Sequence, residues 1–198
     1  MEAKILENIH ASFNEIAIIP DSQWKIASEF FYEKTLKKDE YFSAAGDKAT
    51  EVAVVLSGIL RIYIPLEDGR EFIRDFKIPG TVVASYSSLI SGDEAKVSIQ
   101  ARTDTVLAVI PYAKLEKLYE MHSCWQELGR KVAEFKFIEG EQREIELATL
   151  NAQEQYDVFC KRFPEVLGKV PQYDIASYLG ISPVSLSRVI SKSNKNNK

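Results

Sequence analysis

Residues Tyr173 to Lys192 read YDIASYLGISPVSLSRVISK, and this stretch predicts two short helices joined by a tight turn. The first helix would end at Gly180, because glycine readily adopts the left-handed backbone that closes many helices. Ser182 can cap the second helix through its hydroxyl, and Pro183 suits the first helical position, where its missing N–H has no partner to lose. The pattern is therefore that of a helix-turn-helix.

The second of these helices has an apolar side and a polar side. Leu186, Val189 and Ile190 recur at helical spacing and would pack against the first helix. The opposite side carries mainly hydroxyl and cationic groups, which suit contact with base edges and phosphates in a DNA major groove. An ordinary helical hairpin at the end of a domain is the alternative interpretation. The outward residues are Val184, Ser185, Arg188 and Lys192.

Charge is unevenly divided along the 198-residue chain. The formal net charge is −4, from 25 Lys and Arg against 29 Asp and Glu. From residue 161 onward seven basic residues face two acidic ones, a balance of +5, which leaves 18 basic against 27 acidic residues upstream, a balance of −9. The basic end coincides with the predicted helix-turn-helix, as phosphate contact requires. A solvated lysine-rich tail would produce the same asymmetry.

The remaining composition is that of a globular protein, with 45% hydrophobic and 27% charged residues. No run is long enough for a membrane span, and the start MEAKILENIH lacks the apolar core of a signal peptide. Cys124 and Cys160 have no neighbours at metal-ligand spacing, so we expect reduced thiols and no metal site. These features predict a cytoplasmic protein without a membrane partner.

Between Thr35 and Pro111 the sequence consists of short β-rich runs separated by turn signals. The run EVAVVLSGILRIYI contains Gly58, Asp68-Gly69 marks a hairpin, and Pro79-Gly80 separates the next two runs. Several strands at this spacing indicate an antiparallel sandwich or barrel. The first thirty residues read as helix, so the predicted fold class is α+β.

A long helix is predicted from about Ser123 to Thr149, where no proline interrupts the pattern. At 1.5 Å per residue it would extend about 40 Å, which is too long to cover one small barrel. Apolar residues recur along it at steps of three and four, so we expect this stripe to meet the same helix of a second subunit. A helix packed wholly within its own subunit is the alternative. The predicted interface residues are Trp125, Leu128, Val132, Phe135, Ile138 and Ile145.

A glycine-punctuated β-roll, a long central helix and a carboxy-terminal helix-turn-helix, in this order, resemble the cAMP receptor protein–fumarate/nitrate regulator (Crp–Fnr) family of bacterial transcription factors. The most specific match runs from Gln155-Tyr156 and Arg162-Phe163-Pro164 through IASYLGISPVSLSRV. In the roll, the matching positions are Gly46-Asp47, Leu56-Ser57-Gly58 and Asp68-Gly69-Arg70-Glu71. The likeness covers nearly the whole chain.

The resemblance implies a domain organisation and a set of partners. The domains would be a cyclic-nucleotide-binding-like jelly roll over residues 1–122, a dimerisation helix over 123–150 and a helix-turn-helix DNA-binding domain over 151–198. The protein would act as a homodimer on palindromic double-stranded DNA. Further implied partners are RNA polymerase and a small-molecule effector.

Family members that bind cyclic nucleotides carry a Gly-Glu pair at the start of a short helix and an Arg-Ser/Thr-Ala triplet, which hold the ribose and the cyclic phosphate. Aligned through Ile99-Gln100-Ala101, this chain has Gly80-Thr81 for the pair and Ala95-Lys96-Val97 for the triplet. A buried phosphate would lack its counter-charge without the arginine. We therefore expect weak or no cyclic-nucleotide binding, and the sequence names no other cofactor. The predicted pocket residues are Gly80, Thr81, Val82, Ala95, Lys96 and Val97.

Carried over by position, the family's base-reading side chains fall on Pro183, Val184 and Arg188. Arg188 is the best candidate for a specific contact, because arginine pairs bidentately with guanine O6 and N7. Only SKSNKNNK follows, so we expect any β-hairpin wing after the recognition helix to be rudimentary. Other polar side chains are better suited to backbone phosphates. These are Gln172, Tyr173, Ser182, Ser185, Ser187 and Lys192.

Two other classes of protein compete with a DNA-binding regulator. Metal-dependent cupin enzymes also use a jelly roll, and they place their histidine ligands on its strands. His10 and His122 both lie outside the predicted β region. No nucleophile–histidine pattern or phosphate-binding loop is apparent, so we expect no enzyme activity. The second class is a regulatory sensor module that acts through protein contacts without DNA affinity. The acidic total charge favours that module, whereas the intact LGISPVSLSR favours the transcription factor.

Overall fold

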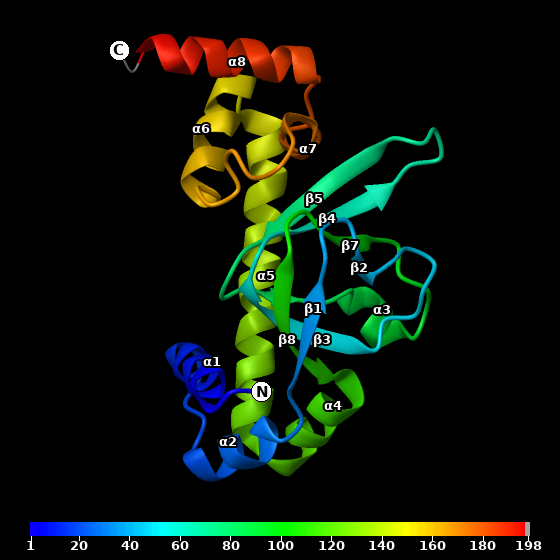
Figure 1. Ribbon diagram of the computed structural model, residues 1–198, viewed down its shortest axis with the longest axis vertical. Helices are drawn as coiled ribbons and strands as arrows, with labels where there is room; N and C mark the ends of the chain where they lie inside the picture. The colour runs from blue at the N-terminus through cyan, green and yellow to red at the C-terminus, as the bar shows by residue number, and fades with distance from the viewer. Residues whose placement is uncertain (197–198) are drawn as a thin grey trace.

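The computed structural model describes residues 1–196, so the last two residues of the predicted 151–198 domain lie outside it. Figure 1 shows a β-roll beside the middle of one long helix, with one group of helices at the lower end and another at the upper end. This arrangement confirms the predicted α+β fold, in which a roll precedes a long helix and a helix-turn-helix.

Within residues 1–196, the roll contains two four-stranded antiparallel sheets, ordered β1-β8-β3-β6 and β2-β7-β4-β5. The predicted hairpin at Asp68-Gly69 joins β4 to β5, where the Leu66 N–H donates to the Arg70 carbonyl at 2.8 Å. The strands are β1 (Tyr32–Leu36), β2 (Tyr41–Ser43), β3 (Glu51–Ser57), β4 (Leu60–Pro65), β5 (Glu71–Lys77), β6 (Val82–Val83), β7 (Ser98–Ala101) and β8 (Thr105–Pro111).

The space between the two sheets is filled by apolar side chains that alternate along the strands. Leu60, Ile99 and Leu107 are fully buried there. The turn from β3 to β4 requires glycine, because Gly58 has φ +88° and a Cβ would lie 2.4 Å from the Thr105 hydroxyl oxygen. This close approach explains the glycine in the middle of a strand-rich run.

The lower group of helices forms a second core. Helices α1 (Ala3–Ile16), α2 (Asp21–Ser28) and α4 (Tyr112–Met121) pack there against the start of α5 (Ser123–Thr149). The rings of Trp24 and Trp125 lie at its centre, with centroids 6.5 Å apart. Helix α5 is one uninterrupted helix of 27 residues, as predicted.

The apolar stripe of α5 is shared between two surfaces. Trp125 and Leu128 are buried in the lower core of their own subunit, and Val132 packs against the same cluster. Trp125 and Leu128 are therefore covered by their own subunit and do not belong to a dimer interface, whereas the half-buried Val132 stays a predicted interface residue. The upper residues of the stripe, Phe135 and Ile138, are exposed.

Helix geometry explains why the stripe divides. Each residue advances about 100° around a helix, so a step of three falls about 60° short of a full turn and a step of four exceeds it by about 40°. From Trp125 to Ile145 the steps are three, four, three, three and seven, which together turn the stripe roughly 160° around the axis. The exposed fractions on the outer side are 58% for Phe135, 59% for Ile138 and 50% for Ile145.

The upper group contains α6 (Ala152–Arg162), α7 (Gln172–Tyr178) and α8 (Pro183–Asn196). Asn151 caps α6 and forms a reciprocal capping box with Glu154. Gly180 lies in the turn between α7 and α8 with φ +68°, which confirms the predicted left-handed residue. The described end of the chain extends α8 through Asn196.

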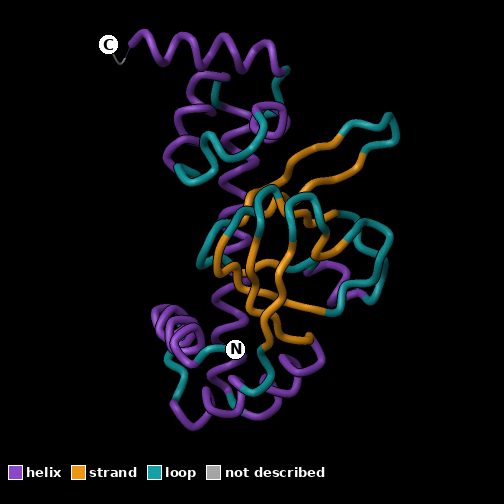
Figure 2. Tube along the Cα trace, viewed as in Figure 1, coloured by secondary structure: helices purple, strands orange, loops and turns teal. Residues whose placement is uncertain are grey.

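The upper helices and the roll share one hydrophobic core. The Phe76 ring on β5 lies 6.0 Å from the Phe159 ring and 5.8 Å from the rings of Phe163 and Tyr178, centroid to centroid. Figure 2 shows the β4–β5 hairpin rising from the roll beside these helices, and α7 packs on β5. The helix-turn-helix is therefore docked on the roll.

Candidate nucleic-acid interface

Helix α8 begins as the sequence predicted. The Ser185 N–H donates to the Ser182 hydroxyl oxygen at 3.1 Å, and Pro183 is the first helical residue. Leu186 is fully buried in the core below, and Ile190 packs against the same cluster. Burial of this side fixes which residues of α8 face outward.

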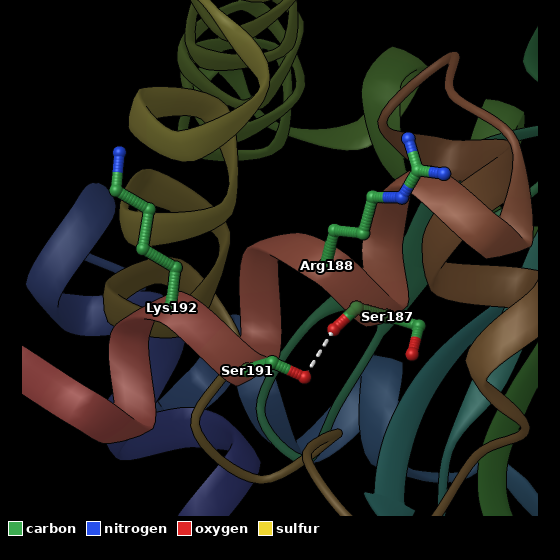
Figure 3. A pocket seen from close by; sticks show the side chains of 4 residues that line it. All are labelled: Ser187, Arg188, Ser191 and Lys192. Atoms are coloured by element: carbon green, nitrogen blue, oxygen red, sulfur yellow. Dashed lines mark hydrogen bonds between the residues drawn. The ribbon is translucent and has the colours of Figure 1, made fainter.

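The outward side of α8 is accessible from Val184 to Lys192. Figure 1 shows the helix lying across the upper end of the molecule, and Figure 3 shows the Arg188 and Lys192 side chains extending from it. An open hollow of about 310 Å³ is lined by Ser187, Arg188, Ser191 and Lys192. Three of these four residues were predicted to contact DNA. Ser191 was missed, although it is one turn after Ser187 and donates to the Ser187 carbonyl at 2.8 Å.

The other residues predicted to contact DNA lie outside this hollow, at the starts of α8 and α7. The hydroxyl oxygens of Ser182 and Ser185 are 2.9 Å apart and bond to each other, so both are engaged at the helix start. Val184 is exposed in the first turn of α8, beside the exposed Pro183. Gln172 is exposed at the start of α7.

Tyr173, also in the first turn of α7, contacts the roll. Its hydroxyl oxygen accepts a hydrogen bond from Nη2 of Arg102 at 2.6 Å, and the Arg102 guanidinium lies 5.7 Å from the centre of the ring. The ring remains exposed on its other side. Tyr173 thus belongs to the contact between the two halves of the molecule, a role that the sequence did not predict.

Asp174 is the centre of that contact. Its carboxylate accepts a hydrogen bond from Nη1 of Arg61 on β4 at 2.9 Å and also binds Arg102. Arg61 is itself buried and donates to Gln100 and to Glu71. Its positive charge is therefore paired with two carboxylates, those of Asp174 and Glu71. We name Asp174, Arg61 and Arg102 the Asp174 cluster. It fixes the first helix of the helix-turn-helix on the roll.

A second contact joins the helix-turn-helix to α5. Nη1 of Arg162 on α6 donates to the buried Glu146 carboxylate at 3.0 Å and to the Tyr178 hydroxyl at 3.1 Å. The Arg143 guanidinium on α5 lies 4.1 Å from the centre of the Tyr178 ring and donates to the Tyr178 carbonyl. Helix α7 is therefore held by the roll at its start and by α5 at its end.

The predicted effector site needs correction. The short helix of the roll is α3 (Tyr86–Ser91), and Ser85 is its N-cap residue, so the pair that precedes it is Ala84-Ser85. Gly80-Thr81 instead forms the turn between β5 and β6, where the Thr81 hydroxyl donates to the Ile78 carbonyl at 2.7 Å. The assignment of Gly80-Thr81 to the start of the short helix is therefore wrong.

The other predicted pocket residues are dispersed. Val82 packs against the lower helical core, whereas Val97 is buried between the two sheets. Ala95 is buried in a backbone pair with Asp47, and Lys96 is exposed. The described residues do not bring these side chains together around one cavity.

A small hollow of about 90 Å³ does lie beside the start of α3. Ser85 and Ser43 line it, and both hydroxyl groups are buried without a hydrogen-bond partner among the described residues. Such groups normally find a partner, so the hollow is polar and incompletely satisfied. The remaining lining residues are Phe42, Asp47, Lys48, Ala49, Thr50 and Glu51.

Both histidines have structural roles. Nε2 of His10 bonds to the Ile19 carbonyl at 2.8 Å and its ring stacks on Trp24, while Nδ1 of His122 accepts from the Cys124 N–H at 3.1 Å. Within residues 1–196, no three His, Cys, Asp or Glu side chains gather as metal ligands would. None of the helices in this part of the chain is both long and apolar enough to cross a bilayer.

Comparison with known proteins gives matches to both halves of the chain. Residues 33–122 match the family model described as cyclic nucleotide-binding domain. The fumarate and nitrate reduction regulatory protein of Vibrio cholerae is 27% identical over 176 residues, which cover 82% of this chain and 69% of that protein. The transcriptional activator protein anr of Pseudomonas aeruginosa is 25% identical over 177 residues, covering 82% and 70%.

A solved structure shows the same arrangement of elements. FixK2 from Bradyrhizobium japonicum superposes with a TM-score of 0.74 and 25% sequence identity, covering 84% of this chain and 86% of that one. Both matches cover 82% of this chain, about 162 of its 198 residues, which is more than residues 1–149 together, so they include part of the upper helices. The likeness is therefore not confined to the roll.

Proposed function

The chain belongs to the Crp–Fnr family of bacterial transcriptional regulators, and we propose that it acts as a homodimer that binds duplex DNA through helix α8. Its relatives are regulators, and the chain is a regulator rather than an enzyme. The observation that carries the DNA-binding proposal is the outward face of α8, with Arg188 and Lys192 one turn apart on it.

The charges on this face are available to a ligand. Arg61, Arg102 and Arg162 are each bonded to carboxylates, whereas the described residues offer Arg188 no carboxylate within 4 Å. An arginine that is not needed by the fold can pair with guanine, and Lys192 one turn later can pair with phosphate. The helix dipole adds positive potential at the start of α8, which phosphate also favours.

The exposed side of α5 supports the homodimer. Phe135, Phe137, Ile138 and Ile145 stand exposed on the upper half of a helix whose lower half is buried in its own subunit. Aromatic and branched apolar side chains in this number on one helix are typical of a protein interface. Two parallel α5 helices would also place both α8 helices at one end of the dimer, as two half-sites one turn apart require.

For the roll, we propose an effector other than a cyclic nucleotide. The hollow beside α3 is about 90 Å³, below the roughly 300 Å³ at which drug-sized ligand pockets begin. Ser85 stands where the family's glutamate would hold the ribose, and Ala95 stands where its arginine would supply the charge that a cyclic phosphate needs. The two unpartnered hydroxyl groups favour a small polar ligand.

A salt titration of binding to random-sequence duplex tests the DNA-binding proposal. Contact with several phosphates predicts affinity that falls steeply between about 50 and 200 mM salt, and selection from random DNA should then yield a palindromic site. Arg74→Ala, an exposed arginine on β5, serves as a control that should leave both results unchanged. Absence of binding in low salt would instead favour a sensor module that acts through protein contacts.

A further inference from the structure

Val184 differs from the other apolar side chains of α8. Leu186 is fully buried and Ile190 packs against the core, whereas Val184 is 62% exposed in the first turn of the helix. Its neighbours on the outward face, Ser187 and Arg188, are polar. The fold therefore gives Val184 no packing role that requires a branched apolar side chain.

The local hydrogen bonds engage the two serines around Val184, whereas Val184 is exposed in this turn beside Pro183. The hydroxyl groups of Ser182 and Ser185, on either side of it, bond to each other, and the Ser182 hydroxyl also accepts from the Ser185 backbone N–H. The residues at the start of a recognition helix are those that contact base edges. A side chain without donors or acceptors is thus placed where the bases would be read.

We propose that Val184 reads the 5-methyl group of a thymine in each half-site, an inference that rests on the DNA-binding function proposed above. Apolar contact with this methyl is the one favourable major-groove contact open to an aliphatic side chain. Opposite cytosine, guanine or adenine, valine would cover polar base atoms without bonding to them, which is unfavourable. Val184 therefore excludes those bases as well as selecting thymine.

The spacing to Arg188 locates the thymine. Four residues separate the two positions, which places them about 6 Å apart along the helix axis and on the same face. Base pairs rise by about 3.4 Å, so the two side chains reach positions about two base pairs apart. The selected half-site should carry a thymine within about two base pairs of the guanine read by Arg188.

Deoxyuridine, which lacks only the methyl group, gives a direct test. In the operator selected from random DNA, each thymine is replaced in turn by deoxyuridine and binding is measured. Burial of one methyl predicts about a fourfold loss of affinity per half-site at one thymine position, and about fifteenfold when both half-sites are replaced. Val184→Ser should abolish that loss, whereas Arg74→Ala, on the exposed surface of β5, should keep it.

The outcomes separate this inference from the function on which it rests. Selective binding without a methyl-sensitive thymine near the guanine would overturn the role of Val184 and leave the DNA-binding proposal intact. A sensitive thymine whose effect persists in Val184→Ser would also overturn it, because another residue would then contact the methyl. Failure to bind any duplex in low salt would end both proposals.

Discussion

The Asp174 carboxylate accepts a hydrogen bond from Nε of Arg102 at 2.7 Å, although 72 residues separate the two in the sequence. Arg102 follows the last residue of β7 in the roll, whereas Asp174 lies in the first turn of α7 in the helix-turn-helix. Both side chains are buried, so the pair is shielded from solvent and from salt. The roll and the helix-turn-helix are thus joined by a charge pair inside the protein.

Removal of the Asp174 charge should destabilise the docked arrangement. In Asp174→Asn, Arg61 keeps Glu71 and Arg102 keeps Asp39, but both lose their buried counter-charge. Loss of one partner of a buried ion pair lowers the free energy of unfolding by about 3–5 kcal/mol. Because Glu71 and Asp39 still pair with the two arginines, we expect a loss near the lower end, about 3 kcal/mol. Urea unfolding measures the change. Asp68→Asn, at the exposed pair with Arg70, should behave like the wild type, and equal stability of the two variants would contradict the prediction.

The shared core predicts that a residue of the roll stabilises the helix-turn-helix. Phe76→Ala removes a fully buried ring that contacts Phe159, Phe163 and Tyr178, and should cost about 3–5 kcal/mol. Hydrogen exchange should consequently accelerate in α6 and α7. A control, Val109→Ala, lies between the two sheets of the roll and should affect strand amides first. Unchanged exchange in α7 after the loss of Phe76 would show that the upper helices are stable alone.

The two cysteines should be poor nucleophiles in the native protein. Burial raises the pKa of the Cys124 thiol and of the Cys160 thiol above the ordinary value. A raised pKa means that less thiolate is present at pH 8 than in a free thiol, and the thiolate is the reactive form. Iodoacetamide should therefore label both residues more slowly than free cysteine at pH 8, with a rate that still rises above pH 9. Rapid labelling at neutral pH would contradict this expectation.

Features set by local chemistry could be predicted from the sequence. Gly180, Ser182 and Pro183 define the turn and start of α8 through backbone geometry and a side-chain cap, which require no knowledge of distant residues. The long helix was predicted for the same reason, since its evidence is an uninterrupted pattern. The order of these elements then gave the fold class.

Features set by tertiary packing were missed or misplaced. Asp174 and Arg102 carry no signal in the sequence that relates them, because only the docking of α7 on the roll brings them together. The site before α3 was placed four residues early, at Gly80-Thr81 instead of Ala84-Ser85, because the alignment was anchored on β7 and loop lengths could not be fixed. The division of the α5 stripe depends on which side of the helix the subunit itself covers.

The upper half of α5 should control the oligomeric state. Ile138→Glu places a carboxylate on the exposed apolar side, where pairing with a second subunit would require its desolvation. We expect the dimer dissociation constant to rise by at least about tenfold, measured by analytical ultracentrifugation. Ile18→Glu is a matched control, because Ile18 is also exposed but lies between α1 and α2. A variant that dimerises like the wild type would show that the interface lies elsewhere.

Arg188 should contribute specificity rather than general attraction to DNA. Arg188→Ala removes a bidentate contact to guanine, so binding to the selected operator should weaken by about 1–3 kcal/mol and preference at that base pair should relax. Lys192→Ala, one turn later, should weaken binding to all sequences nearly equally and reduce the salt dependence, as loss of a phosphate contact does. Fluorescence anisotropy with operators mutated at each position distinguishes the two patterns. If Arg188→Ala retains the full preference for its guanine, another side chain reads that base, and Ser187 or Ser191, which line the same hollow, are the next residues to test.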